Sequence, residues 1–227
     1  RYPLVTGVQT CALPIYPGQL AVRVAPHIST RYADRLRSLD TLVQVLVTQY
    51  RSEPGNYLAF FSSFDYLQQA LDRLQQRASD IPVWAQSRGM AEADRDAFLG
   101  RFTDHGQGIG FAVLGGAFGD GIGLPGRRLI GARIAALGLP QINPVNEQMR
   151  ARLQARFGRG YDYTYLYPGL QKVVQAAGRV IRSEQDCGTV WLLDVSTGEL
   201  LELGRHQAQA VEAAFSPSGE HLITGGW

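Results

Sequence analysis

The sequence of 227 residues is poor in the side chains that build metal centres and disulfide frameworks. It has two cysteines, Cys11 and Cys187, which lie far apart along the chain, and four histidines. None of these residues follows the spacing of a zinc site, and a disulfide scaffold needs a denser set of cysteines. We therefore expect neither a metal site nor a disulfide framework.

Long apolar runs are scarce too. No segment approaches the roughly 20 consecutive apolar residues that a membrane-spanning helix needs, and no signal peptide is recognisable. Hydrophobic residues nevertheless make up 45% of the chain, which is enough for a packed core. The length predicts one large domain, with or without a smaller piece.

Lysine is nearly absent, since Lys172 stands alone beside 21 arginines. The net charge of +2 is also uneven along the chain. Residues 121–182 carry ten basic residues against two acids, whereas residues 183–227 carry one arginine against seven acids. The basic block favours contact with a polyanion, and the acidic end looks like a different piece of protein.

Between residues 19 and 194, apolar runs of strand length alternate with segments of helical periodicity. The pattern predicts strands at 20–25, 56–63, 81–87, 108–116, 128–137 and 188–194, and helices at 35–52, 64–78, 91–102, 143–158 and 170–182. Asn143 followed by Pro144 is a typical helix start. Strands that alternate with helices predict an α/β fold, in which a parallel sheet is covered by helices on both faces.

Both ends of the chain depart from this pattern. Residues 5–15, VTGVQTCALPI, resemble the conceptual translation of a sequencing adapter, so we interpret residues 1–16 as an artefact and residues 17–194 as the α/β domain. Residues 195–227 change to short strand-length runs broken by turn pairs. Together with the preceding strand they resemble one blade of a WD-repeat β-propeller, and one blade cannot bury its own faces.

A glycine-rich loop, GGAFGDGIGLPGRRL (115–129), follows the strand predicted at 108–116. It contains G-x-G-x-x-G at Gly121, Gly123 and Gly126, but a dinucleotide-binding turn has to open a helix, whereas Pro125 and an apolar strand follow here. No Gly-Lys-Ser/Thr follows, which excludes a P-loop. The backbone N–H groups and two arginines suit an anion or a nucleic acid backbone.

The helix predicted at 170–182 carries polar side chains on one stripe. Gln175, Arg179 and Arg182 stand at i, i+4 and i+7, and the apolar side chains point the other way. The helix is therefore expected to pack by one face and to present an amide and two guanidinium groups on the other.

Three segments resemble, in order and spacing, the C-terminal motor domain of the DinG/XPD-like, Rad3-related ATP-dependent DNA helicases of superfamily two. They are YLAFFSSFDYL (57–67), GAFGDGIGLPG (116–126) and QAAGRVIRSEQDCG (175–188), and the last contains the family's sixth motif in full. The resemblance covers about residues 19–194 and implies a RecA-like α/β fold. Within this family, the sequence most resembles bacterial DinG-type proteins.

In such motors ATP lies between two RecA-like domains. The resemblance implies that Arg179 and Arg182 are catalytic and stabilise charge on the transferring phosphoryl oxygens. It implies an ATP-binding set of Gln175, Gly178, Arg179, Arg182, Asp120 and Gly121. ATP and Mg²⁺ are the implied cofactors, held mainly by a first motor domain, and no iron–sulfur cluster is expected in this chain.

The same resemblance implies a DNA-binding set. Its members are Ser62, Ser63, Arg88, Gly116, Arg127 and Arg128. The implied partners are single-stranded or forked DNA, ATP and the first motor domain, in the cytoplasm and nucleoid of a bacterium. The fifth motif departs from the family pattern at two positions. Asp120 stands where the family has glutamate, and Gly123 stands where it has aspartate. The resemblance implies that this aspartate helps to couple the nucleotide site to binding of the DNA strand, so its loss puts that coupling in doubt.

The chain has no Walker A motif, no magnesium-binding acid box and no cysteine set for an iron–sulfur cluster. We therefore expect it to be the second motor half of a helicase, a hydrolase acting on acid anhydrides that unwinds DNA 5′ to 3′, and to be inactive alone. The alternatives are a WD-repeat propeller or scaffold fragment, a dinucleotide-dependent enzyme, and a misassembled chimeric reading frame.

Overall fold

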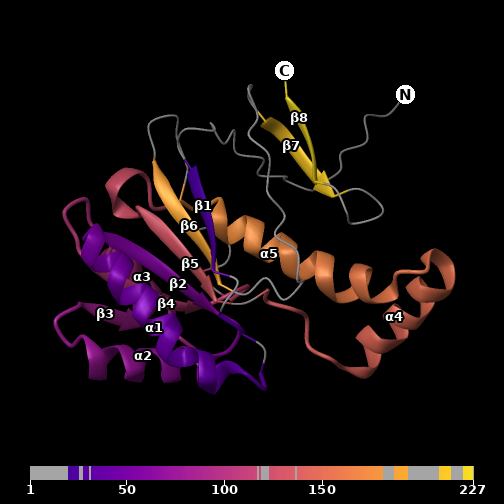
Figure 1. Cartoon of the computed structure of the whole chain (residues 1–227), viewed down its shortest axis with the longest axis horizontal. Helices are drawn as coiled ribbons and strands as arrows, with labels where there is room; N and C mark the ends of the chain where they lie inside the picture. Colours follow the sequence, from indigo (N-terminus) through magenta and orange to yellow (C-terminus); the bar gives the residue numbers. More distant parts are fainter. Residues whose placement is uncertain are drawn as a thin grey trace.

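The computed structural model describes residues 20–25, 28–30, 32–116, 118, 123–135, 137–180, 187–193, 210–215 and 222–226. Strands and helices alternate from residue 20 to residue 193, as Figure 1 shows. In chain order they are β1 (Leu20–Ala25), α1 (Arg35–Ser52), β2 (Asn56–Phe61), α2 (Phe64–Arg77), β3 (Val83–Ala85), α3 (Glu92–Gly100), β4 (Gly108–Val113), η1 (Gly126–Arg128), β5 (Gly131–Ala135), α4 (Pro144–Phe157), η2 (Asp162–Leu166), α5 (Tyr167–Ala177) and β6 (Gly188–Leu193).

The first six strands form one sheet in the order β1-β6-β5-β2-β4-β3. Every neighbouring pair is parallel, so the carboxyl ends of all six strands meet at one edge. We call this the carboxyl edge of the sheet, and the other the amino edge. The central strand β2 is wholly buried, because it lies between β5 and β4 and is covered on both faces. The predicted parallel α/β sheet is confirmed.

One face of the sheet packs against α1 and α2 (Figure 1). Alternate residues of β2, which are Tyr57, Ala59 and Phe61, point into this layer. The two helices cover them with apolar stripes at helical spacing: Leu39, Leu42, Val43, Leu46 and Val47 from α1, and Leu67, Ala70, Leu71 and Leu74 from α2. Period two in the strand and period 3.6 in the helices thus build this core.

The opposite face packs against α3 and α5. Leu58 and Phe60 of β2 point to this side, and Val173 and Ala176 bring α5 onto it. Phe98 and Phe102 pack around Trp84 of β3, with ring centroids 4.9 to 6.2 Å apart in the Trp84 pairs. Gln175, the first residue of the segment 175–188 that resembles the helicase sixth motif, lies on α5, so this packing sets where that segment begins relative to the sheet.

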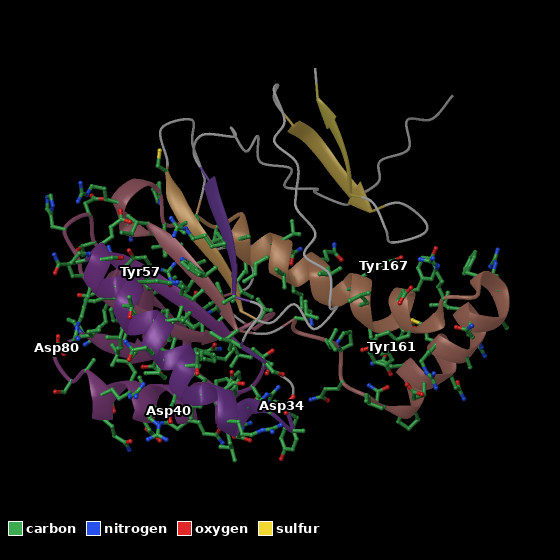
Figure 2. All side chains as sticks on the ribbon, in the orientation of Figure 1. Asp34, Asp40, Tyr57, Asp80, Tyr161 and Tyr167 are labelled. Atoms are coloured by element: carbon green, nitrogen blue, oxygen red, sulfur yellow. The ribbon has the colours of Figure 1, made fainter. Side chains whose placement is uncertain are left out.

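A helical arm made of α4 and η2 extends from the sheet. Tyr161 and Tyr167, which flank η2 on either side, lie far from β1 in Figure 2. Asn143 accepts a hydrogen bond from Asn146 N at 2.8 Å and Pro144 follows it, which confirms the predicted start of α4. Gly158 ends the helix at φ 73°. No residue of α4 is buried.

The segment η2 is a π-helix, which the sequence analysis did not predict. Proline has no N–H, so Pro168 cannot bond to the carbonyl of Thr164, and its ring crowds that carbonyl. The chain accommodates this by widening the turn, and Tyr167 N bonds to Asp162 O. The helix then continues as α5.

The predicted helix at 170–182 is wrong at its carboxyl end, because α5 stops at Ala177. Gly178 N bonds to Val174 O at 2.9 Å, and the next two residues form tight turns, with Arg179 N on Ala176 O and Val180 N on Ala177 O, both at 3.2 Å. Glycine is a poor helix former, and it ends the helix here. Arg179 therefore stands beyond the helix, not on a stripe with Gln175.

The remaining predicted elements are confirmed with shifted ends. Strand β5 begins three residues later than expected because Gly126–Arg128 form a turn of 3₁₀ helix, and β4 ends at Val113. Beyond residue 193, β7 (Ala210–Phe215) and β8 (Leu222–Gly226) pair antiparallel with each other in a separate sheet. In the described part of the chain, no helix is both long and apolar enough to span a membrane.

Candidate functional site

The carboxyl edge of the sheet brings together four of the six residues predicted to bind DNA. Ser62 and Ser63 directly follow β2, Arg88 lies in the loop after β3, and Gly116 lies in the loop after β4. These strands are neighbours in the order β2-β4-β3, so the three loops are adjacent. Residues from three loops, 25 to 54 positions apart in the sequence, thus share one edge.

The two serines have different hydrogen-bond partners. Ser63 is the N-cap of α2, and its Oγ accepts a hydrogen bond from Tyr66 N at 3.2 Å. Ser62 Oγ accepts one from Arg35 Nη2 at 2.7 Å. The amino end of α2, with its positive dipole end, therefore opens at the carboxyl edge beside an arginine.

Arg35 is a residue of this edge that the sequence analysis missed. Its Nε donates to Thr30 O at 2.9 Å, and its guanidinium lies over the ring of Tyr66 at 4.8 Å from the centroid. These contacts hold the cation against Ser62 although it stands at the first position of α1. One signal was present: α1 has no acid in its first turn, where the helix dipole favours one, and begins with arginine instead.

Arg88 is held loosely. Its Nη2 bonds to Asp65 Oδ1 at 2.9 Å and its guanidinium lies 4.9 Å from the Phe64 ring centroid. The arginine side chain is 69% exposed and the aspartate 82%, so the pair is worth well under about 1 kcal/mol. The guanidinium is therefore free to exchange this carboxylate for a phosphate.

The loop after β4 is held by a buried amide. Gln86 Oε1 accepts a hydrogen bond from Val113 N at 2.8 Å, and Gly116 N bonds to Val113 O at 3.1 Å. A Cβ on Gly116 would lie 3.2 Å from Val113 O and 3.4 Å from Gln86 Nε2. The loop thus approaches the sheet closely, and a side chain at Gly116 would crowd Val113 and Gln86.

Arg127 and Arg128 do not join the other four residues. Both precede β5, so they lie at the amino edge of the sheet, on the far side from Ser62. Arg128 Nε donates to Phe102 O at 2.7 Å, and Arg127 O accepts from Asn56 Nδ2 at 3.2 Å. The side chain of Arg128 and the carbonyl of Arg127 thus hold the loops at the start of β2 and β5, and the DNA-binding role of the two arginines stays a prediction.

The residues predicted to bind ATP are described only in part. Gln175 is exposed on α5, Gly178 ends that helix, and Arg179 is half-buried in the turn after it. A cation next to a helix carboxyl end is stabilised by the helix dipole, which suits Arg179. Asp120, Gly121 and Arg182 lie outside the described residues.

The geometry disfavours the dinucleotide alternative. A dinucleotide-binding turn opens a helix that points its N–H groups at the pyrophosphate. Here Gly126 starts a single turn of 3₁₀ helix, and β5 follows at Gly131. Among the residues that the structure describes, no group of three or more His, Cys, Asp or Glu side chains is placed to hold a metal ion.

Two side chains with shifted pKa values, Arg133 and Tyr57, are packed under α1 and away from the loops at the carboxyl edge. Burial lowers the pKa of Arg133 on β5 to about 10, although Tyr57 beside it acts in the other direction. Burial also raises the pKa of Tyr57 to about 12, and its hydroxyl donates to Glu53 O at 2.6 Å. The guanidinium lies 4.4 Å from the Tyr57 ring centroid. This is a packing arrangement inside the core, not a reactive site.

Comparison with known proteins gives the family. Residues 46–202 match the model of the helicase C-terminal domain family. The chain is 27% identical over 177 residues to a protein of Methanocaldococcus jannaschii named "Probable ATP-dependent helicase", covering 71% of this chain and 26% of that protein. It is 26% identical over 228 residues to the ATP-dependent DNA helicase CHL1 of Yarrowia lipolytica, covering 84% of this chain and 28% of that protein. The chain thus corresponds to about a quarter of each relative's length.

Solved structures give the same fold. An apo structure of XPD has a TM-score of 0.63 and 21% identity, over 78% of this chain and 36% of that chain. The structure of S. tokodaii Xpd4 has a TM-score of 0.58 and 17% identity, over 78% and 34%. The fold is therefore the RecA-like fold of helicase motor domains, and with the family match over most of its length, the chain belongs to the helicase C-terminal domain family.

Proposed function

We propose that this chain is the C-terminal motor domain of an ATP-dependent DNA helicase of the Rad3-related type, similar to DinG-type proteins. One observation carries the proposal: the loops after β2, β3 and β4 place Ser62, Arg88 and Gly116 at one edge of the sheet, while Gln175 and Arg179 stand at the end of α5. The first group suits a nucleic acid strand, and the second a nucleotide.

Strand binding at the carboxyl edge is supported by its chemistry. The amino end of α2 offers backbone N–H groups, and Arg35 and Arg88 add two guanidinium groups. Such groups bind phosphates without reading bases, which suits a motor that moves along any sequence. Single-stranded DNA or the single-stranded arm of a fork is the proposed ligand.

Nucleotide binding is proposed for the turn after α5. Arg179 and Arg182 would face the phosphates of ATP, with Gln175 and Gly178 beside them and Asp120 and Gly121 from the loop after β4. A guanidinium next to a helix carboxyl end fits a phosphate, because its planar fork binds two oxygens. ATP with Mg²⁺ supplies the phosphoryl group; a first motor domain would hold most of it, and any iron–sulfur cluster would belong there too.

The activity of the whole protein follows from this assignment. Hydrolysis of ATP, stimulated by DNA, would drive unwinding 5′ to 3′ on bacterial chromosomal DNA, as in DNA repair. This chain alone would bind DNA and not hydrolyse ATP. The β7–β8 hairpin is compatible with a WD-repeat-like tail over residues 195–227, which stays a second proposal beside that of a chimeric reading frame.

The proposal is tested on the purified chain with a fluorescein-labelled oligo-dT. Fluorescence anisotropy should show binding that weakens steeply between 50 and 200 mM salt, because phosphate contacts release counterions. A malachite-green assay with Mg²⁺-ATP and the same DNA should show no phosphate release. Absence of DNA binding at low salt would overturn the strand assignment, and DNA-stimulated hydrolysis would overturn the inactivity.

A further inference from the structure

Lys172, the single lysine of the chain, reaches from α5 to the carboxyl edge of the sheet. Its Nζ donates a hydrogen bond to Gly138 O at 3.1 Å. Gly138 lies just after β5, and Val173, the next residue of α5, is buried in the core. The anchored helix therefore fixes where the lysine side chain runs.

Two glycines leave room for that side chain. Gly115 has a φ of +74° and Gly138 a φ of +58°, a backbone region that other residues rarely adopt. A Cβ on Gly115 would lie 3.0 Å from Lys172 Cδ and 3.2 Å from Cε, and one on Gly138 would lie 3.5 Å from Cδ. The methylene groups of Lys172 therefore pass between the loops at Gly115 and Gly138, and both loops approach them closely.

The Lys172 side chain ends at the edge of the sheet where the proposed function places the bound DNA strand. Gly115 follows β4 and Gly138 follows β5, and these two strands flank β2 in the sheet. Ser62 directly follows β2. The amine of Lys172 is thus held at the same edge, and it lies on the same helix as Gln175, one turn before it.

The charge of Lys172 has no carboxylate partner in the described part of the chain. The ammonium has three N–H donors, and its acceptor here, Gly138 O, uses one of them. A half-buried cation held by a neutral carbonyl can take an anion on its remaining donors. An ammonium is a compact point charge of the kind that binds phosphate in P-loops.

We propose that Lys172 binds a phosphate group at the carboxyl edge, and that this phosphate belongs to the bound DNA strand. The inference rests on the proposed function and adds a residue to its strand site. The helix α5 would then contact the strand through Lys172 and the nucleotide through the turn at Arg179. The phosphate of ATP is the other source of the same chemistry.

Because Lys172 is the only lysine, an amine-reactive N-hydroxysuccinimide ester modifies this residue and the chain's amino terminus alone. Modification is followed by mass spectrometry with oligo-dT, with Mg²⁺-ATP and without ligand, at 50 and 500 mM salt. We expect oligo-dT to slow acylation of Lys172 several-fold at low salt and not at high salt. Anisotropy in the same samples reports whether DNA is bound.

The outcomes separate the two proposals. Bound DNA with an unchanged rate at Lys172, and no protection by ATP, overturns the role of Lys172 and leaves the proposed function standing. Protection by ATP and not by DNA supports a phosphate contact and assigns it to the nucleotide. No DNA binding at all overturns the proposed function itself, and with it the proposal that Lys172 binds a phosphate of the DNA strand.

A variant series checks the same point without a reagent. Lys172→Met should weaken oligo-dT binding and lower the slope of log affinity against log salt by about 1, whereas Lys172→Arg keeps the charge and the slope. Arg51→Met is the matched control, since it removes one exposed cation at the amino edge. Equal binding by Lys172→Met and Arg51→Met, with both variants folded by circular dichroism, would overturn the proposal.

Discussion

Ser62 and Ser63, which follow β2, have different roles although they are adjacent. Ser63 turns its hydroxyl toward the backbone of α2, where it accepts from Tyr66 N, whereas Ser62 accepts from Arg35. A capping bond satisfies an N–H that would otherwise be unpaired, so it bears on stability. A serine held by an arginine at an exposed edge bears on ligand binding.

The capping role of Ser63 gives a prediction at the scale of one residue. Ser63→Ala should lower the free energy of unfolding by about 1 kcal/mol, because α2 loses its cap. Ser63→Asp and Ser63→Asn should both restore most of it, since each supplies a capping oxygen. Urea unfolding followed by circular dichroism measures the difference.

The same variants separate stability from strand binding. Ser63→Asp adds a carboxylate where a phosphate is proposed to lie, so it should weaken oligo-dT binding although it stabilises α2. Ser63→Asn should bind like the natural chain. If the aspartate variant binds DNA as well as the asparagine variant, no phosphate approaches this helix end.

At the scale of elements, much of the fold was predictable because the strands and helices carry clean periodicities. The apolar run at 57–61 and the stripe of α1 have one interpretation each, and Asn143-Pro144 marks the start of α4 by local chemistry alone. The end of α5 was not predictable from periodicity, because Arg179 and Arg182 continue a helical spacing past Gly178. The structure nevertheless ends the helix at Ala177, just before this glycine, which is a poor helix former.

The position of candidate residues was predictable where they lie in loops that follow strands, and not where it depends on tertiary contacts. Ser62, Arg88 and Gly116 follow parallel strands and meet at the carboxyl edge. Arg127 carries the same charge but precedes its strand, so it lies at the opposite edge. Arg35 and Lys172 were missed because their contacts, with Ser62 and Gly138, span 27 and 34 positions.

The arm of α4 and η2 is held by a contact that depends on pH. Tyr165 donates its hydroxyl hydrogen to Glu147 Oε1 at 2.6 Å, and Arg150 pairs with the same carboxylate at 2.7 Å. The bonds from Tyr165 and then Arg150 lower the pKa of Glu147 below its usual value. Since α4 buries no residue of its own, this contact is a main tie between the two segments.

The sign of the effect follows from that shift. A carboxyl whose pKa is lowered by folding binds fewer protons in the folded state, so its contribution is present above the usual pKa near 4.5 and is lost as pH falls through the folded pKa. Circular dichroism at 222 nm should show helix loss on acidification. Glu147→Gln should lack this component, and an acid transition identical in both proteins would show that Glu147 does not tie the arm.

At the scale of the molecule, parallel topology determines which loops can cooperate. Six parallel strands place every following loop at one edge, where binding sites of open α/β sheets are found. The sheet does not include β7 and β8, which pair only with each other among the described strands. A two-stranded hairpin is marginally stable by itself. The folded body therefore depends on residues 20–193 for its core.

This division predicts the result of shortening the chain. A chain that ends at Glu202, the last residue of the family match, should keep the thermal midpoint of the full chain within about 1–2 °C, because no strand of the six-stranded sheet is lost. A control that ends at Cys187 removes β6, which lies between β1 and β5, and should not fold. Differential scanning calorimetry measures both, and a fall of more than about 5 °C for the longer chain, roughly 1–2.5 kcal/mol, would show that residues 203–227 belong to the motor domain.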